Sequence, residues 1–360
     1  MLVLILFFGL RFNGFSLING VSWLENRSGL RFGEFGIAYS HLPPDEFRCA
    51  PEASCPLTVE LALKPRSTND GRFRIIMIIH GGADADQLVI GQWRSALIIM
   101  NGDDYDGKAG TPKIGLRNAF SRQRGRWVAI SSDRDGTSVY IDGEKAGSSR
   151  KLTLRIPNGE NGAQLVIGNS VYGRHSWEGD IFGIALFDTV LTRSDIENHF
   201  SRWSDRNDFS FLRRENPKRL WVLDPQPGIQ TADQADGDPH LEIPRKMRVL
   251  KKEILALPFQ TNQVNLPFFQ DIIINLVGFM PIGFFMYATL LSRGEGMERH
   301  GFGLTVSVCF LLSIFIEVVQ AWIPSRSSEL LDLTMNTMGA AAGALFYRYS
   351  REWWTSREIC

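Results

Sequence analysis

The chain has no excess of charge of either sign. Its 39 lysine and arginine residues balance 39 aspartate and glutamate residues, so the formal net charge is +0 over 360 residues. Proteins that bind nucleic acids carry basic stripes, and this balance argues against such a surface. The length suggests two or three domains. Charged residues and glycine are concentrated before about Gly237, whereas long apolar runs dominate after Asp271.

Cysteine is scarce, with four residues in the chain. Cys309 lies in a long apolar run and Cys360 is the last residue. Cys49 and Cys55 flank the short segment APEAS, and a disulfide bond between them would suit an oxidising compartment. Spacing does not establish the geometry that a disulfide needs, so this pairing is a prediction.

Three apolar runs occupy the last third of the chain. Each has roughly the 17–25 residues that a helix needs to cross a bilayer core about 30 Å thick. Buried helices of a soluble bundle would normally show a charged face. These runs lack one, so we predict membrane-spanning helices. The runs cover residues 271–291, 301–323 and 330–347.

Polar side chains nevertheless interrupt the apolar runs. A carboxylate deep in a membrane helix costs roughly 2.5–3.5 kcal/mol, so such residues usually face a bundle interior or a wet cavity. Spacings of three or four residues pair them on single helix faces, and the short connections make consecutive helices antiparallel. Two interpretations remain open, a working site or polar contacts that hold the helices together. The predicted cluster consists of Asp271, Asn275, Glu317, Gln320, Arg326, Asp332 and Asn336.

This set of residues resembles the VanZ-like membrane family. The matching pattern runs from Asp271-x-x-x-Asn275 through GFMPIG and Glu317-x-x-Gln320 to Arg326 and Asp332-x-x-x-Asn336-x-x-Gly339. The founding member of that family is linked to resistance against the antibiotic teicoplanin, and no established mechanism comes with the resemblance. Family members usually have a further membrane helix before this core. Residues 1–10, MLVLILFFGL, could be an anchor that supplies it, the end of a longer helix, or a cleaved signal peptide.

Short alternating or apolar segments bounded by turn residues fill the earlier part of the chain. Asp135-Gly136 and Asp142-Gly143 are typical of hairpin turns. Several short strands at this spacing predict a sandwich, and alternation along the strands predicts which side chains face inward. The predicted inner-face residues are Trp127, Val128, Ile130, Val139 and Ile141.

The same region resembles the laminin-G or concanavalin A-like jelly roll. The resemblance rests on Trp127-Val-Ala-Ile before Ser138-Val-Tyr-Ile-Asp-Gly143, on Leu165-Val-Ile-Gly168, and on Leu191-Thr-Arg-Ser-Asp-Ile196. It implies an all-β sandwich, and members of the family often bind carbohydrate or protein, sometimes through calcium. Concanavalin-like glycosidases carry a Glu-x-Asp-x-x-Glu run, which this sequence lacks.

Calcium is the one cofactor that the sequence suggests. Asp103, Asp104 and Asp106 lie in the acidic segment NGDDYDGK and could provide the oxygen ligands that calcium prefers. Their spacing is not that of an EF-hand, and a solvated turn is the competing interpretation. The aromatic side chains that could stack on a sugar, or instead pack in the core, are Tyr105, Tyr172 and His175.

The predicted organisation is multidomain, with an all-β jelly-roll sandwich joined to a small α-helical membrane bundle. Arginines between the first two apolar runs and after the third favour a cytoplasmic location for that side, which puts the sandwich outside the cell. The basic stretch PRKMRVLKK opposes this assignment, because it would lie outside, near anionic headgroups. The predicted segments are a hydrophobic anchor or signal-like segment at 1–18, the sandwich at 19–204, a linker at 205–270 and the bundle at 271–350.

These features predict a multi-pass protein of the bacterial cell membrane that binds an envelope glycan, cell-wall material or a protein partner. Its partners would include membrane lipid and exclude nucleic acid. An integral-membrane enzyme that acts on an envelope headgroup through Asp271, Glu317 and Asp332 is the alternative, and it is not the favoured one. A purely structural anchor for the sandwich is a third hypothesis. An enzyme requires an open, wet cavity, whereas an anchor predicts paired side chains.

Overall fold

The computed structural model contains two compact units, one formed by Ser16–Leu250 and one that contains Lys251–Cys360. The predicted anchor or signal-like segment at residues 1–18 lies outside the described residues, apart from Ile18. The described residues are 18–44, 46–47, 55–69, 71–83, 85–105, 107, 110–121, 124–157, 159–206, 208–224, 230–231, 240–257, 266–294, 296–323, 326 and 328–357.

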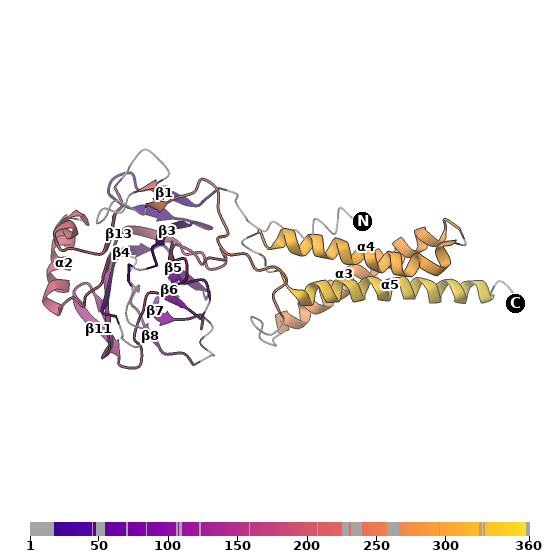
Figure 1. The fold of residues 1–360 in the computed structure, drawn as a ribbon, viewed down its shortest axis with the longest axis horizontal. Helices are drawn as coiled ribbons and strands as arrows, with labels where there is room; N and C mark the ends of the chain where they lie inside the picture. Colours follow the sequence, from indigo (N-terminus) through magenta and orange to yellow (C-terminus); the bar gives the residue numbers. More distant parts are fainter. Residues whose placement is uncertain are drawn as a thin grey trace. The chain divides into compact units, whose positions relative to one another are not determined.

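The first unit is a sandwich of two eight-stranded antiparallel sheets, which confirms the predicted all-β jelly roll (Figure 1). One sheet contains, in spatial order, β1 (Val21–Trp23), β2 (Leu30–Phe32), β13 (Gly179–Phe187), β4 (Leu57–Pro65), β9 (Arg126–Asp133), β10 (Gly136–Ile141) and β11 (Glu144–Ser149), and β14 (Arg219–Val222) also pairs with β13. The other contains β15 (Gln230–Thr231), β16 (Leu241–Glu242), β3 (Ala38–Leu42), β12 (Ala163–Ile167), β5 (Phe73–His80), β6 (Gln87–Trp93), β7 (Ala96–Asn101) and β8 (Lys113–Leu116).

Two tight hairpins form at the Asp-Gly pairs. Asp142 and Gly143 join β10 to β11, and their φ values of +54° and +81° meet the requirement of a type I′ turn for two positive φ angles. Between β9 and β10, Gly136 has a φ of +120°, and a Cβ there would lie 2.3 Å from the carbonyl oxygen of Ser149. Glycine is therefore required at this turn for both its backbone angle and its lack of a side chain.

Alternating side chains fill the space between the two sheets. Val128 and Ile130 of β9 and Val139 of β10 are fully buried there, and Ile141 packs against them, as predicted. Trp127 instead lies in a second core cluster on the other face of β9. The prediction that Trp127 lines the inner face is wrong, because adjacent residues of a strand point to opposite faces.

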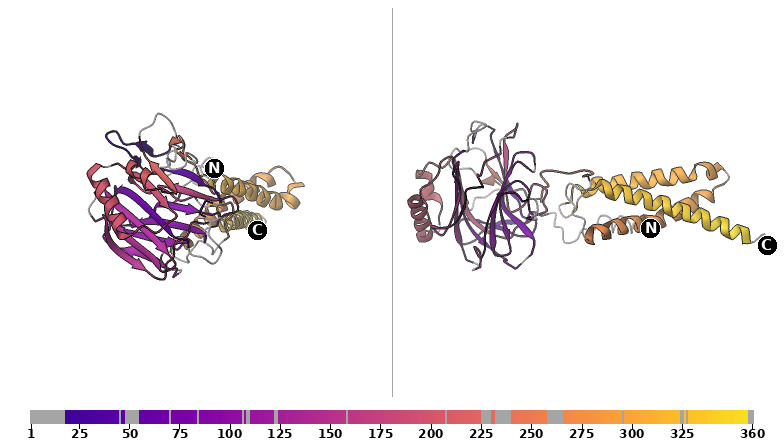
Figure 2. Two further views of the ribbon diagram at one scale, coloured as in Figure 1. Left: turned by 60° about the vertical axis from the view of Figure 1, so that its left-hand side comes forward. Right: turned by 90° about the horizontal axis from the view of Figure 1, so that it is seen from below.

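Helix α2 (Arg193–Arg206) covers the outer face of the sheet that contains β4, β9 and β13 (Figures 1 and 2). Its Ile196 and Trp203 are buried in the second core cluster, with Phe211 and Leu212 of the 3-10 helix η1 (Ser210–Arg214). The rings of Trp127 and Phe209 stack there with centroids 4.8 Å apart. The central strands β4, β9 and β13 are therefore buried on both faces, which explains why they do not alternate with exposed polar residues.

Much of the segment predicted as a linker at 205–270 belongs to the sandwich. Helix η1 and strands β14 and β16 lie within it, and the sandwich unit extends to Leu250. Leu220, Trp221 and Val222 of β14 are fully buried. Arg219 forms a buried ion pair with Glu46, with Nε 2.6 Å from Oε1. Only four residues form β14, and a strand this short has too little periodicity to be distinguished from a loop in the sequence.

The second unit contains three long helices that run alongside one another, α3 (Leu266–Leu291), α4 (Gly296–Gln320) and α5 (Leu330–Arg357) (Figures 1 and 2). Two segments, Phe268–Leu291 and His300–Gln320, are long and apolar enough to cross a membrane. The third predicted span is helical, but among the described residues α5 is not one of the segments long and apolar enough to cross a membrane, and it continues to Arg357 through a polar segment. Large apolar side chains point outward from all three helices, and exposed apolar surface of this kind marks a membrane or protein contact. Examples are Ile274, Leu311 and Phe346, which are 65%, 62% and 64% exposed.

Candidate functional site

The polar residues predicted to converge lie where the start of α3, the end of α4 and the start of α5 meet. Asn275 of α3 donates a hydrogen bond from Nδ2 to Oδ1 of Asp332 of α5, at 2.6 Å. Helical spacing puts Asp271 one turn before Asn275, and Asp271, Glu329 and Arg326 all interact electrostatically with Asp332. Helix periodicity thus brings polar and charged side chains from α3, from α5 and from the connection before α5 into one cluster.

Glu317 links α4 to the beginning of α5. The residue is 1% exposed, and its Oε2 accepts a hydrogen bond from the backbone N–H of Glu329 at 2.8 Å. Ser328 also forms a side-chain hydrogen bond with Glu317. A carboxylate at this position accepts a hydrogen bond from a free N–H group at the start of α5. It also lies at the positive end of the α5 helix dipole. Glu317 therefore acts as a cap supplied by another helix.

A short segment before α3 pairs with the connection before α5. The backbone N–H of Ala256 donates to Ser328 O at 2.9 Å, and the N–H of Leu330 donates to Ala256 O at 3.0 Å. The backbone N–H of Leu255 donates to Oγ of Ser328 at 3.0 Å, and Ser328 is fully buried. These bonds satisfy the backbone of the connection beside Glu317 and hold it in place.

The remaining predicted members have other neighbours. Asn336 donates from Nδ2 to Oγ of Ser313 at 2.9 Å, and both side chains are buried. Ser313 lies one helical turn before Glu317 on α4, so the polar face of α4 consists of Ser313, Glu317 and the buried Gln320. Sequence reasoning missed Ser313, because a serine in an apolar run carries no charge and is common in membrane helices. It missed Ser328, because the contacts of a residue in a connection depend on the path of the chain.

We predict that Arg326 and the carboxyl group of Asp332 are energetically coupled. Arg326→Ala should lower the melting temperature of the protein in detergent, because Asp332 would remain beside Asp271 and Glu329 with less positive charge. Adding Asp332→Asn should recover part of that loss, since asparagine can still accept the hydrogen bond from Asn275 and bears no charge. The coupling expected from a double-mutant cycle is about 0.5–3 kcal/mol.

Arg293 provides the matched control for this cycle, because it is an exposed arginine after the far end of α3. Arg293→Ala combined with Asp332→Asn should be additive. Additive effects for Arg326→Ala and Asp332→Asn as well would contradict a shared site.

In the sandwich, Asp104 is already occupied by protein partners. Its Oδ2 accepts hydrogen bonds from Nζ of Lys113 at 2.8 Å and from Oγ1 of Thr111 at 2.9 Å. The lysine ammonium group provides the positive charge that a calcium ion would bring to this oxygen. Asp106 lies outside the described residues, and within the described ranges no three His, Cys, Asp or Glu side chains are placed to hold a metal. Calcium at Asp103, Asp104 and Asp106 stays a prediction.

The aromatic residues proposed for sugar stacking pack against protein groups. The Tyr105 ring stacks on Phe73 with centroids 5.3 Å apart and lies 4.8 Å from His175. The guanidinium carbon of Arg174 lies 5.3 Å from the centre of the Tyr172 ring. These contacts favour the packing interpretation over a sugar platform.

Of the two cysteines predicted to pair, the structure describes only Cys55, which is disulfide-bonded. Cys49 lies outside the described residues, so the pairing of Cys49 with Cys55 stays a prediction. Cys309 is free and buried in α4.

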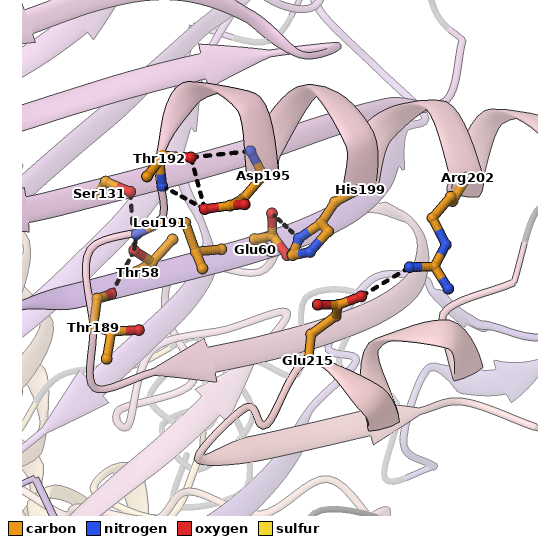
Figure 3. A network of polar contacts seen from close by, with 10 residues as sticks. All are labelled: Thr58, Glu60, Ser131, Thr189, Leu191, Thr192, Asp195, His199, Arg202 and Glu215. Atoms are coloured by element: carbon orange, nitrogen blue, oxygen red, sulfur yellow. Dashed lines mark hydrogen bonds and ion pairs between the residues drawn. The ribbon is translucent and has the colours of Figure 1, made fainter.

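A buried acid–histidine pair fixes α2 to the sheet (Figure 3). Nδ1 of His199 lies 3.1 Å and 3.0 Å from the two carboxylate oxygens of Glu60 on β4, and the two side chains are 2% and 0% exposed. The histidine ring stacks on Phe187 and meets Phe211 edge-on. Burial raises the pKa of Glu60. Because the pair is sealed beneath α2, it stabilises the fold and cannot reach a substrate.

Two further contacts hold α2 at its ends (Figure 3). At the first turn, Thr192 and Asp195 form a capping box, with the Asp195 N–H donating to Oγ1 of Thr192 at 3.2 Å and the Thr192 N–H donating to Oδ2 of Asp195 at 3.0 Å. The Thr192 hydroxyl, which donates to Oδ2 of Asp195 at 2.7 Å, and the Thr192 N–H together lower the pKa of Asp195. Near the last turn, Arg202 pairs with Glu215 at 2.8 Å.

Two family models match separate parts of the chain. Residues 226–351 match the VanZ/LLP1 family. Residues 43–197 match the concanavalin A-like lectin/glucanases superfamily. No curated protein matches the sequence.

Several solved structures resemble parts of the chain at low identity. The CBM40 of Ruminococcus gnavus IT-sialidase, bound to α2,3-sialyllactose, is 13% identical with a TM-score of 0.35, over 48% of this chain and 96% of that one. Trypanosoma rangeli sialidase, in complex with 2,3-difluorosialic acid, is 14% identical with a TM-score of 0.40, over 52% of this chain and 29% of that one. A candidate carbohydrate binding protein of Bacteroides ovatus is 14% identical with a TM-score of 0.38, over 65% and 62%.

The chain thus spans less than two thirds of the Bacteroides ovatus protein and less than a third of the Trypanosoma sialidase. TM-scores this low carry no conclusion about function. The family models alone establish the two parts, in the order that the motifs predicted. The chain is therefore a fusion of a concanavalin A-like β-sandwich with a VanZ/LLP1 region.

Proposed function

We propose that the protein is a multi-pass membrane protein of the bacterial cell envelope whose sandwich binds a glycan or cell-wall polymer. The supporting observation is that one chain joins a domain of a lectin and glucanase superfamily to two helices that are long and apolar enough to span a membrane. A sandwich tethered in this way stays close to envelope polymers, where its effective concentration is high.

The sandwich lies on the outer side of the membrane in this proposal. Arg293 follows α3, and Arg348 and Arg351 lie in the last part of α5, so these arginines share one side of an antiparallel bundle. The positive-inside rule assigns that side to the cytoplasm. The disulfide bond at Cys55 supports the assignment, because disulfides persist in oxidising compartments outside the cytoplasm.

The polar cluster of the helical unit serves mainly as structure in this proposal. Glu317 accepts the backbone N–H of Glu329, and Asp332 accepts the amide of Asn275. Such pairing is what an anchor requires, whereas an acid–base catalyst needs a carboxyl group that meets its substrate. The enzyme hypothesis would be favoured if Asp332→Asn left stability intact and removed the cellular phenotype.

Screening the full-length protein in detergent on a glycan array tests the proposal. We expect retention on one class of glycan, and we expect it to persist with a calcium chelator because Lys113 already pairs with Asp104. A detergent-solubilised membrane protein without a sandwich is the control for binding through the micelle. Retention no greater than that of the control on every glycan would refute glycan binding.

A further inference from the structure

An open groove of about 790 Å³ lies at one edge of the sandwich. It forms where β8, the last strand of one sheet, approaches β11, the last strand of the other. The turn after β8 and the hairpin between β10 and β11 form its walls, and Phe200 of α2 also lines it. The groove is therefore accessible from solvent and bounded by elements of both sheets and of α2.

Six of the thirteen residues that line this groove are charged, with positive charge in excess. Four cations, Arg117, Arg124, Arg126 and Lys145, face two anions, Asp142 and Glu144, so the lining carries a net charge of 4 − 2 = +2. The whole chain has a net charge of +0, so this local excess does not follow from the composition. A concave surface of one sign attracts ligands of the opposite sign.

Two of the cations are already used within the protein. Asp142 accepts hydrogen bonds from Nη2 of Arg124 at 3.1 Å and from Nη1 of Arg126, and its other oxygen accepts the backbone N–H of Trp127 at 3.0 Å. These bonds neutralise Asp142 and hold both arginines against the hairpin turn. Arg124 and Arg126 therefore form a fixed positive wall.

The other two cations are available to a ligand. Arg117 and Lys145 are exposed, and among the described residues neither forms an ion pair. They come from opposite walls, Arg117 from the turn after β8 and Lys145 from β11. An arginine guanidinium group binds carboxylate or phosphate through two parallel hydrogen bonds, and lysine adds a point charge. Phe200 offers an apolar surface on which the C–H face of a sugar ring can lie.

We propose that this groove is the ligand site of the sandwich and that it binds an acidic glycan, one that carries carboxylate or phosphate groups. This inference rests on the proposed function and gives it a site and a ligand class. Arg117 and Lys145 contact the acidic groups from the two walls, and Phe200 lies against the sugar ring. The site is separate from the acidic segment around Asp104, which Lys113 neutralises.

The test measures binding of the full-length protein in detergent to three probes. Oligogalacturonate carries carboxylates, its fully methyl-esterified form has the same backbone without charge, and a phosphomannan oligosaccharide carries phosphates. We expect at least one acidic probe to bind about tenfold or more tightly than the methyl ester, because each charge-assisted hydrogen bond adds about that factor. The stronger of the two acidic probes distinguishes a carboxylate from a phosphate ligand. Binding should also weaken as salt is added.

Variants of the two exposed cations locate the site. Arg117→Gln and Lys145→Gln, made singly, should each lower the affinity for the acidic probe by about tenfold or more. Arg134→Gln is the control. Arg134 is exposed in the turn at the opposite end of β10, and its replacement removes one positive charge from the same sandwich. All three positions are on the surface, so the melting temperature of each variant should match that of the wild type.

Three results would overturn the inference. Equal affinity for the acidic probes and the methyl ester would exclude an acidic ligand while leaving glycan binding intact. Acid-selective binding that Arg117→Gln and Lys145→Gln do not weaken more than Arg134→Gln would exclude this groove as the site. If none of the three probes bound and no glycan on the array retained the protein, the proposed function itself would be overturned.

Discussion

Replacing Gly343 with leucine should separate α3 from α5 and unfold the helical unit in mild detergent. A Cβ on Gly343 would lie 1.9 Å from the carbonyl oxygen of Met280, well inside any real contact distance. The obstructing atom belongs to the backbone of α3, so no side-chain rotation can relieve the clash. Overpacking that side chains can absorb costs about 1–3 kcal/mol, and a forced backbone shift should exceed that range.

The same close approach recurs along this helix pair. A Cβ on Gly339 would lie 2.1 Å from the Leu276 carbonyl oxygen, and one on Gly283 would lie 1.9 Å from the Ala340 carbonyl oxygen. Gly339 and Gly343 form a small-xxx-small pattern, which lets membrane helices pack backbone against backbone. Because the contact extends over several turns, one large side chain at Gly343 should disturb the whole interface.

Gly278 provides the matched control for Gly343. It also lies inside a helix, α3, but a Cβ there would meet nothing within 4 Å. The melting temperature of Gly278→Leu should therefore be close to that of the wild type. Gly343→Leu should have a much lower melting temperature or elute as an aggregate from gel filtration. If both variants melted together, the stability of the unit would not depend on this approach.

Local signals predicted much of this fold. The Asp-Gly pairs marked two hairpins because few residues tolerate the positive φ angles of such turns, and Asp142 and Gly143 have them. The apolar runs predicted three helices because a bilayer needs about 20 apolar residues, and all three helices are present. These features depend on a few neighbouring residues, so they can be found without knowledge of the tertiary structure.

Features that depend on distant partners were not predictable. The alternation in β9 predicts the inner face for Trp127, because the packing of α2 on the outer face has no signature in β9 itself. The residues of β14 resemble a linker in sequence, because these four residues become a strand only through pairing with β13. The sequence alone also did not predict the excess of positive charge in the groove, since Arg117 and Lys145 are 28 positions apart.

In the candidate membrane site, too, some contacts could be predicted from local sequence and others depended on distant partners. Helical spacing and antiparallel connections were enough to bring Asn275 to Asp332. They did not predict that Glu317 would accept a backbone N–H from Glu329, because that bond depends on the path of the connection between α4 and α5. Periodicity therefore predicted which faces meet, while the individual hydrogen bonds depended on loop geometry.

The pair formed by Glu60 and His199 should be the most sensitive polar contact of the sandwich. His199→Ala leaves the fully buried Glu60 carboxyl group without its partner and removes the ring that packs against Phe187 and Phe211. Leaving a buried hydrogen-bonding group without its partner typically costs about 1–3 kcal/mol. Replacing both with apolar residues of similar size, in Glu60→Leu with His199→Phe, should recover most of that loss.

Hydrogen exchange of the α2 amides is the readout for these variants, because it reports on this helix within the full-length protein. His199→Ala should accelerate exchange along α2, and the double variant should restore protection. Arg202→Ala is the control, since its ion pair with Glu215 is partly exposed and such pairs contribute about 0–1 kcal/mol. Equal acceleration in His199→Ala and Arg202→Ala would show that the buried pair has no special role.

The pH dependence of stability gives the pair a second, independent test. Burial raises the pKa of Glu60, the hydrogen bond from His199 opposes that shift, and the charge of Asp195 adds to it. The folded protein therefore keeps a proton at Glu60 at a pH at which the unfolded chain has released it. Stability from this group is complete below the ordinary carboxyl pKa and is lost as pH rises through the raised value.

Glu60→Gln removes this titration while keeping a carbonyl oxygen that can accept a hydrogen bond from His199. The stability of the wild type relative to Glu60→Gln should consequently decline as pH rises above the ordinary carboxyl range. The measurement is α2 protection in both proteins across a pH series, after correction for the intrinsic exchange rate at each pH. A difference that stayed constant with pH would mean that Glu60 has the same proton occupancy in the folded and unfolded states. A difference that grew with pH would mean that the histidine outweighs burial and keeps Glu60 ionised in the folded protein.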